Sequence, residues 1–120
     1  MPIDTSTVQD WLDRYVAAWR TYDPGDIGTL FSEDVVYRYH PGDPPVMGRD
    51  AVVASWLEDR DPDGSWNADY RVWAVSGDMA AATGETHYAD GSHYFNVFLL
   101  RFRGAECCEF TEFFLTPRAS

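Results

Sequence analysis

Residues 22–57, YDPGDIGTLFSEDVVYRYHPGDPPVMGRDAVVASWL, decide the fold of this chain of 120 residues. Asp23-Pro24 predicts the start of a short helix, because an N-capping aspartate is followed by proline at the first helical position. Asp34 is the expected end of that helix. Residues 35–40 then read as a strand, since they are rich in β-branched and aromatic side chains.

The second half of this stretch predicts a crossing loop and another helix. Three prolines in residues 41–45 remove backbone donors, so these five residues are expected to form a loop. A helix is predicted after Gly48, with these apolar side chains directed inward: Val52, Val53, Trp56 and Leu57. Helix, strand, loop and helix in this order predict a cone-shaped pocket.

A longer amphipathic helix precedes this stretch. It is predicted to begin near Ser6, because Ser6 and Gln9 have the spacing of a capping box. Apolar residues at helical spacing form one stripe along it: Val8, Trp11, Leu12, Tyr15, Val16 and Trp19.

The residues after Gly64 predict strands joined by tight turns. The strands are expected near residues 66–76, 79–89, 93–103 and 106–116, with turns at Gly77-Asp78, Asp90-Gly91 and Gly104-Ala105. Dipeptides of this kind suit two-residue hairpins, whose central residues often need positive φ. Gly84, inside the second strand, is expected to mark a bulge or bend. The whole chain, 1–120, is predicted to form a single α+β domain.

The charge of the chain argues against several classes of partner. The formal net charge is −11, and all nine basic residues are arginines. Such a surface repels phosphate backbones and anionic lipids, so neither nucleic acid nor a membrane is expected as a partner. No apolar run approaches the roughly 20 residues of a membrane span, and the acidic N-terminus lacks the features of a signal peptide. A cytoplasmic location is the resulting expectation.

Neither a disulfide framework nor a metal site is predicted. Cys107 and Cys108 are adjacent and would point to opposite faces of a strand, so buried thiols are expected. His40, His87 and His93 are the only histidines, and their spacing is not typical of zinc ligands. The sequence has no glycine-rich phosphate loop and no nucleophile elbow, so no cofactor is expected.

The predicted turns set a register, and the register assigns side chains to faces of the sheet. A two-residue turn at Asp90-Gly91 pairs His87 with Tyr94, and the next turn pairs Asn96 with Phe113. One face is then expected to carry Tyr70, Glu85, His87, Tyr94, Asn96, Phe98, Thr111 and Phe113. Apolar walls with a few polar groups are typical of a small-molecule pocket. Hydrogen bonding among polar residues at the sheet rim is the purely structural alternative.

The second face of the predicted sheet is also rich in aromatic side chains. It is expected to carry Trp73, Phe95, Leu99, Phe110 and Phe114. Three helices can cover only one face, so a homodimer formed back to back through this second, convex face is predicted.

The chain resembles the NTF2-like superfamily, which includes ketosteroid isomerase and the polyketide cyclases related to SnoaL. The resemblance spans residues 8–115, and its most specific parts are GDIGTLFSEDVVY, PP-x-x-GRDAV, VFLLRF and CCEFTEFF. It implies an α+β, cystatin-like cone in which a curved, mostly antiparallel sheet packs against three N-terminal helices. The superfamily hosts isomerases, cyclases, dehydratases, epoxide hydrolases and non-catalytic binders, so the resemblance implies a fold more than a function.

The resemblance to ketosteroid isomerase implies roles for particular residues. Tyr15 lies where that family places its oxyanion-hole tyrosine, and the general-base aspartate corresponds to Tyr39 or His40. The protonated oxyanion-hole aspartate falls on Phe98, and the pocket tryptophan falls near Phe113. Phe98 cannot donate a hydrogen bond, so steroid isomerisation by the family's own mechanism is not expected.

The predicted function is acid/base chemistry, such as isomerisation, cyclisation or dehydration, on a small apolar or aromatic carbonyl compound. His40 is the expected base, because an unperturbed imidazole titrates near neutral pH, and Tyr15 and Asn96 would stabilise or orient a developing oxyanion. The expected ligand contacts are Trp19, Trp56, Tyr70, Glu85, His87, Tyr94, Phe98 and Phe113.

Alternatives remain for the protein and for single residues. The domain would bind a small ligand without turning it over, or serve interactions with its cavity filled by aromatic side chains. In the alternative for these two residues, His40 lies at the surface at the end of a strand, and Tyr15 is a core residue. Epoxide hydrolysis would need a central arginine beside two carboxylates, but Arg71 and Arg101 are expected on the convex face.

Overall fold

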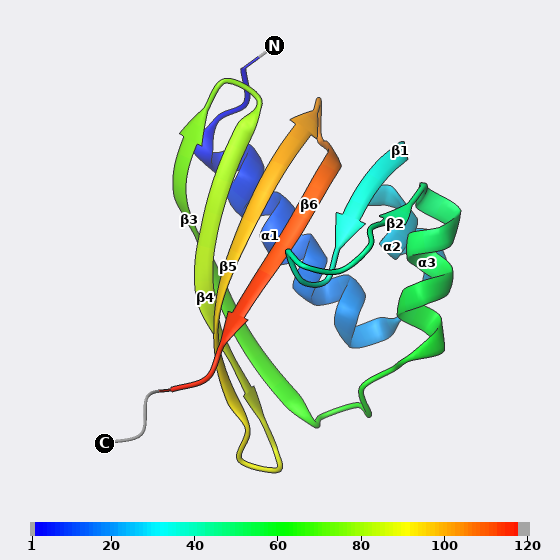
Figure 1. Cartoon of the computed structure of the whole chain (residues 1–120), viewed down its shortest axis with the longest axis vertical. Helices are drawn as coiled ribbons and strands as arrows, with labels where there is room; N and C mark the ends of the chain where they lie inside the picture. The colour runs from blue at the N-terminus through cyan, green and yellow to red at the C-terminus, as the bar shows by residue number, and fades with distance from the viewer. Residues whose placement is uncertain (1, 118–120) are drawn as a thin grey trace.

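A curved sheet of six strands carries three helices on one face (Figure 1). The computed structural model describes residues 2–117. In chain order the elements are α1 (Thr5–Thr21), α2 (Pro24–Thr29), β1 (Phe31–Arg38), β2 (Val46–Met47), α3 (Arg49–Glu58), β3 (Trp66–Ser76), β4 (Met79–Tyr88), β5 (His93–Arg103) and β6 (Glu106–Leu115). The strand order is β2-β1-β6-β5-β4-β3, antiparallel throughout except for the parallel pair β1 and β6. The predicted α+β architecture is confirmed.

Asp4, and not Ser6, caps α1. The Asp4 carboxylate accepts a hydrogen bond from a backbone N–H of the first turn at 2.8 Å. The predicted capping box is wrong because Gln9 bonds to β3 instead. Its side-chain amide donates to the carbonyl oxygen of Tyr70 at 3.0 Å, and its side-chain oxygen accepts from the N–H of Val72 at 3.1 Å. Gln9 therefore ties α1 to the sheet that the helix crosses in Figure 1.

The short helix α2 begins as predicted but ends earlier. The Asp23 carboxylate caps its first turn, with proline at the first helical position. The predicted end at Asp34 is wrong, because the chain already enters β1 at Phe31. Phe31 pairs with Cys107 of β6, so contact with a distant strand overrides the local helical pattern.

The crossing loop and the third helix follow prediction with one addition. β1 ends at Arg38, two residues before the predicted end of the strand. The loop contains β2, a two-residue strand that pairs with β1 and was not predicted. Helix α3 follows Gly48 as expected and buries Val52 and Trp56.

The four long strands match the predicted ranges to within one residue, but their register does not. The β4–β5 connection is longer than two residues and pairs His87 with His93. A bulge directly after Arg101 displaces β6 by one residue, so Asn96 pairs with Phe114 instead of Phe113. A single-residue displacement turns every later side chain to the opposite face.

The bulge expected at Gly84 lies in β3 instead, at Trp73, which has no partner on β4. Gly84 pairs with Tyr70 in regular register. A Cβ atom at Gly84 would collide with the carbonyl oxygen of Asp69 and with the Tyr70 ring. Glycine therefore permits a close approach between β3 and β4.

We call the face under the helices the covered face and the opposite one the open face. Phe98 on the covered face is fully buried, whereas its neighbour Leu99 on the open face is 48% exposed. Both cysteines are free and buried, as predicted. Within residues 2–117, no helix is long and apolar enough to cross a membrane.

Candidate functional site

A cavity of about 520 Å³ lies between the covered face, α1, α3 and the end of β1. This volume is typical of small-molecule sites. Its lining is Tyr15, Trp19, Tyr22, Tyr37, Tyr39, Trp56, Asp59, Asp61, Tyr70, Thr86, Tyr88, Asp90, Ser92, Tyr94, Asn96, Glu112 and Phe114. All seven tyrosines of the chain are in this set. The fold therefore brings together residues that are scattered from position 15 to position 94.

A chain of hydrogen bonds crosses the floor of the cavity from β3 to β6. The Tyr70 and Thr86 hydroxyls are 2.6 Å apart, and the Thr86 hydroxyl donates to the side-chain oxygen of Asn96 at 2.9 Å. The Asn96 amide then donates to a carboxylate oxygen of Glu112 at 3.2 Å. Each residue comes from a different strand of the covered face, so the curvature of the sheet sets their spacing. Because the Asn96 side-chain oxygen accepts from Thr86, the side-chain nitrogen is directed toward Glu112.

Glu112 is the carboxyl group best placed for proton transfer. Burial raises the pKa of Glu112 from 4.5 to about 7, although the hydrogen bond from Asn96 acts in the opposite direction. A carboxyl group that titrates near neutral pH can both accept and return a proton, which is what general acid/base catalysis requires. Glu112 was not among the site residues predicted from the sequence.

Two tyrosine hydroxyls complete the deep end. Tyr15 of α1 stacks on Phe110 at 5.8 Å between ring centroids, and Tyr37 of β1 stacks on the same ring at 4.3 Å. Burial, followed by nearby groups that include Glu112, raises the pKa of both tyrosines well above the ordinary value. Both side chains therefore stay protonated and can donate hydrogen bonds to an oxygen that gains negative charge.

Trp56 of α3 lies at the same end. Its side chain is 7% exposed and lines the cavity. The indole Nε1 is closed off from solvent and lies close enough to the Tyr37 hydroxyl to lower the pKa of that group. The indole therefore supports Tyr37 and is not itself open to a ligand.

The outer part of the cavity is acidic. Asp61 accepts a hydrogen bond from the Trp19 indole at 3.0 Å, and its backbone N–H donates to the Tyr22 hydroxyl at 2.7 Å. Asp59 and Asp90 are exposed and line the same region. Aromatic rings and carboxylates therefore both line the outer part of the cavity.

The structure places many of the predicted site residues in the lining. These are Tyr15, Trp19, Tyr39, Trp56, Tyr70, Tyr94 and Asn96. Phe98 lies beneath them, with its ring 5.7 Å from Tyr15 and 4.8 Å from Tyr70. Tyr39 rather than His40 faces the cavity, and its hydroxyl is 2.7 Å from that of Ser55. His40 is exposed and accepts a hydrogen bond from the N–H of Gly42 at 3.1 Å.

Several predicted faces are wrong. Glu85, His87, Thr111 and Phe113 lie on the open face, and Phe110 and Phe114 belong to the covered face. The cause is the register described above: the β4–β5 connection and the bulge at Cys108 of β6 each change the parity of the pairing. In the observed register Phe98 pairs with Glu112, which places the carboxylate beside the cavity.

One signal for Glu112 was present in the sequence. Phe110 is a natural core residue, and residues two apart in a strand share a face, so a buried Phe110 would direct Glu112 inward. The predicted register instead placed Phe113 on that face, because a two-residue turn at Gly104-Ala105 pairs Asn96 with Phe113.

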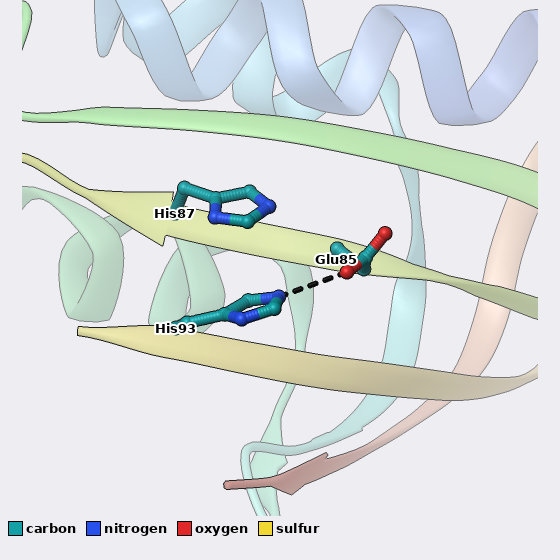
Figure 2. Close-up of side chains that lie close together, drawn as sticks. All are labelled: Glu85, His87 and His93. Atoms are coloured by element: carbon teal, nitrogen blue, oxygen red, sulfur yellow. Dashed lines mark hydrogen bonds and ion pairs between the residues drawn. The ribbon is translucent and has the colours of Figure 1, made fainter. Parts of the chain in front are cut away.

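Glu85, His87 and His93 form a cluster on the open face (Figure 2). One ligand atom from each residue lies within 4.8 Å of the others. The His93 Nε2 and a Glu85 carboxylate oxygen are 2.9 Å apart, and the two imidazole rings stack at 4.0 Å. Two imidazoles and a carboxylate are a ligand set that zinc accepts, whereas no metal site was predicted from the sequence. The cluster lies on the face opposite the cavity.

Comparison with known proteins agrees with this architecture. A sequence model of the SnoaL-like domain matches residues 12–112. No curated protein matches the chain. A solved structure of an NTF-2 like protein of unknown function from Burkholderia xenovorans LB400 is similar at a TM-score of 0.76 and 16% identity, over 96% of this chain and 88% of that one.

Two further structures share the fold. A provisionally assigned ketosteroid isomerase from Kribbella flavida DSM 17836 has a TM-score of 0.76 and 19% identity, over 98% of this chain and 84% of that one. A protein of unknown function with a cystatin-like fold from Methylobium petroleophilum PM1 has a TM-score of 0.72 and 14% identity, over 99% of this chain and 82% of that one. At identities this low, the structural similarity establishes a common fold but not a common reaction. The chemistry has to be argued from the residues of the cavity.

Proposed function

Because the chain belongs to the SnoaL-like domain family, we propose that its cavity binds a small carbonyl compound and that Glu112 moves a proton within it. The reaction would be of the isomerase, cyclase or dehydratase type. The observation that carries this proposal is Glu112 itself, a partly buried carboxyl group that lines the cavity and has its pKa raised to about 7.

The proposed proton transfer uses the groups of the deep end. The Glu112 carboxylate takes a proton from a carbon next to the substrate carbonyl. The electron pair of the broken C–H bond moves toward the carbonyl oxygen, which becomes an enolate oxygen. Tyr15 and Tyr37 donate hydrogen bonds to that oxygen as its charge grows. Return of the proton from Glu112 to another atom completes an isomerisation.

Asn96 has a positioning role in this scheme. Its amide holds the Glu112 carboxylate, and the bonds through Thr86 to Tyr70 hold Asn96 in turn. Locked rotamers of this kind keep a catalytic group within reach of its substrate without a further loss of entropy on binding.

The test begins with a thermal-shift panel of steroids, polyketide-like phenols, terpenoids and short enones, followed by turnover assays of each hit. Glu112→Gln is expected to lower kcat by at least about 100-fold while it keeps the thermal shift. Glu109→Gln is the matched control, because Glu109 lies on the same strand but pairs with Arg101 on the open face. Unchanged turnover in Glu112→Gln would contradict the proposal, and binding without any turnover would indicate a ligand-binding module.

We also propose that a second copy of this chain covers the open face. Trp73, Phe95 and Leu99 are 75%, 42% and 48% exposed there. Arg101, which bonds to Asp78 and Glu109, gives the face charges of both signs, so one copy can complement another. Sedimentation velocity should show a dimer that Leu99→Glu dissociates. A wild-type monomer at about 100 μM would contradict this arrangement.

A further inference from the structure

The cavity carries negative charge with no positive side chain to balance it. Four carboxyl groups line it: Asp59, Asp61, Asp90 and Glu112. None of the arginines or histidines within residues 2–117 is part of the lining. Since the chain also has a net charge of −11, both the local and the overall field attract cations.

The same cavity is surrounded by aromatic rings. Its lining holds seven tyrosines, two tryptophans and a phenylalanine. Ring faces attract cations, and the attraction grows when the site excludes water. Tyr88 and Tyr94 meet edge to face at 5.9 Å, and Tyr94 meets Phe114 in the same way at 5.9 Å. These rings form one wall of the opening, and the Trp19, Tyr22 and Asp61 group forms another part of it.

Two aromatic rings at or next to the opening already have an arginine over one face. The Arg60 guanidinium lies 5.6 Å from the centre of the Tyr22 ring. Arg20 lies 4.7 Å from the centre of the Trp66 ring, which stacks on Trp19 at 3.5 Å. Neither arginine lines the cavity, so the inner faces stay available to a ligand.

The geometry points to an organic cation as the ligand of this cavity: we propose an amine that also carries a carbonyl oxygen. Its ammonium group lies at the opening among Tyr22, Asp61 and Tyr94. Its carbonyl oxygen reaches the deep end, where the protonated Tyr15 and Tyr37 hydroxyls donate hydrogen bonds. This inference rests on the proposed function, because it names the substrate class of the same site.

The carboxylates and the buried tyrosines bind opposite ends of such a ligand. A carboxylate cannot donate to a carbonyl oxygen, whereas a protonated tyrosine hydroxyl can. The acidic opening and the donor-rich deep end therefore fix the direction in which a bipolar molecule enters. That direction brings the carbon next to the carbonyl toward Glu112.

Isothermal titration with two probes of equal shape tests the charge requirement. Acetylcholine carries a quaternary ammonium and an ester carbonyl, and 3,3-dimethylbutyl acetate is its neutral isostere. The wild-type protein is expected to bind the cation at least about tenfold more tightly. Equal affinity for the two probes, or no binding of acetylcholine, would overturn the inference.

Two variants locate the effect in the cavity. Asp61→Asn is expected to weaken acetylcholine at least about fivefold and to leave the neutral probe unchanged, because the amide oxygen can still accept from Trp19. Asp69→Asn makes the same change in net charge at an exposed site of β3 and should have no effect. An equal loss in both variants would assign the preference to overall charge and would contradict a cation site in the cavity.

The two proposals fail in distinguishable ways. If neutral enones bind and turn over through Glu112 while acetylcholine does not bind, proton transfer stands and the cation inference fails. If acetylcholine binds selectively while Glu112→Gln leaves the turnover of every substrate unchanged, the cation site stands and the catalytic role fails.

Discussion

The two faces of the β4–β5 hairpin are built from alternating residues and differ in chemistry. On the covered face, Thr86 and Asn96 are buried and belong to the hydrogen-bond chain that ends at Glu112. On the open face, His87, His93 and Phe95 are accessible to solvent and make contacts with one another. Neighbours 3.3 Å apart along a strand thus serve either a cavity or an outer surface.

The comparison teaches that register decides function here more than composition does. Both faces hold carboxylates and aromatic rings, and the pairing register of the strands decides which carboxylate lies in the cavity. The bulge after Arg101 selects Glu112 in preference to Phe113. The same displacement keeps Glu109 outside, paired with Arg101 at 3.1 Å.

The largest contrast should appear between Phe98 and Leu99. Phe98→Ala removes a fully buried ring and is expected to lower the free energy of unfolding by about 3–5 kcal/mol. Leu99→Ala is expected to cost less than about 1 kcal/mol when measured on the monomer, because Leu99 is half exposed there. Urea denaturation measures both values. Similar losses in the two variants would mean that the open face is as closely packed as the covered one.

A contrast in pH dependence follows from Glu112. Because the folded state holds the pKa of Glu112 at about 7, up from 4.5, it binds more protons than the unfolded state between these values. This group's contribution to stability is therefore complete below pH 4.5 and falls by about 3 kcal/mol as the pH rises to 7. Urea denaturation at several pH values should show a weaker decline in Glu112→Gln. Parallel profiles in the two proteins would contradict the raised pKa of this carboxyl group.

Breaking the hydrogen-bond chain should have a smaller effect. Thr86→Val leaves the Tyr70 hydroxyl and the Asn96 oxygen without their partner and is expected to cost about 1–3 kcal/mol. Thr83→Val makes the same change at an open-face position of β4. It should change the free energy of unfolding by less than about 0.5 kcal/mol. Thermal denaturation of both variants measures the difference. A neutral Thr86→Val would show that the chain does not stabilise the fold.

His40→Ala should have the smallest effect. The side chain is exposed, and its hydrogen bond lies within its own loop, so the free energy of unfolding is expected to change by less than about 0.5 kcal/mol. Turnover of any substrate found in the panel should also be unchanged. A loss of kcat comparable to that of Glu112→Gln would restore His40 as the base.

The sequence was sufficient for the architecture. Helix periodicity, the Asp23-Pro24 cap and the Gly-containing turns located the helices and the long strands, because each is a local preference that the tertiary structure obeys. Local preference failed where a distant partner competed with it. Phe31 belongs to a strand beside Cys107 and not to the predicted helix. The Gln9 side chain bonds to β3 and does not form the predicted capping box.

The candidate site was harder to predict for a physical reason. The tyrosines and tryptophans of the stripe on α1 and of the strands were expected around a pocket, and Tyr15, Asn96 and Tyr70 do line it. Glu112 was missed because a bulge has no strong sequence signal, and a shift of one residue exchanges the two faces of a strand. Sequence alone also gave no indication that every tyrosine converges on one cavity.

The central claim is that Glu112 is a proton acceptor poised near neutral pH inside the cavity. A ¹³C NMR titration of the side-chain carboxyl groups, with the Glu112 resonance assigned by its absence in Glu112→Gln, tests this claim directly. We expect an apparent pKa of about 7 for Glu112, well above the exposed glutamates. A value near 4.5 would contradict the account, because an ordinary surface carboxylate at that position would leave the cavity without its base.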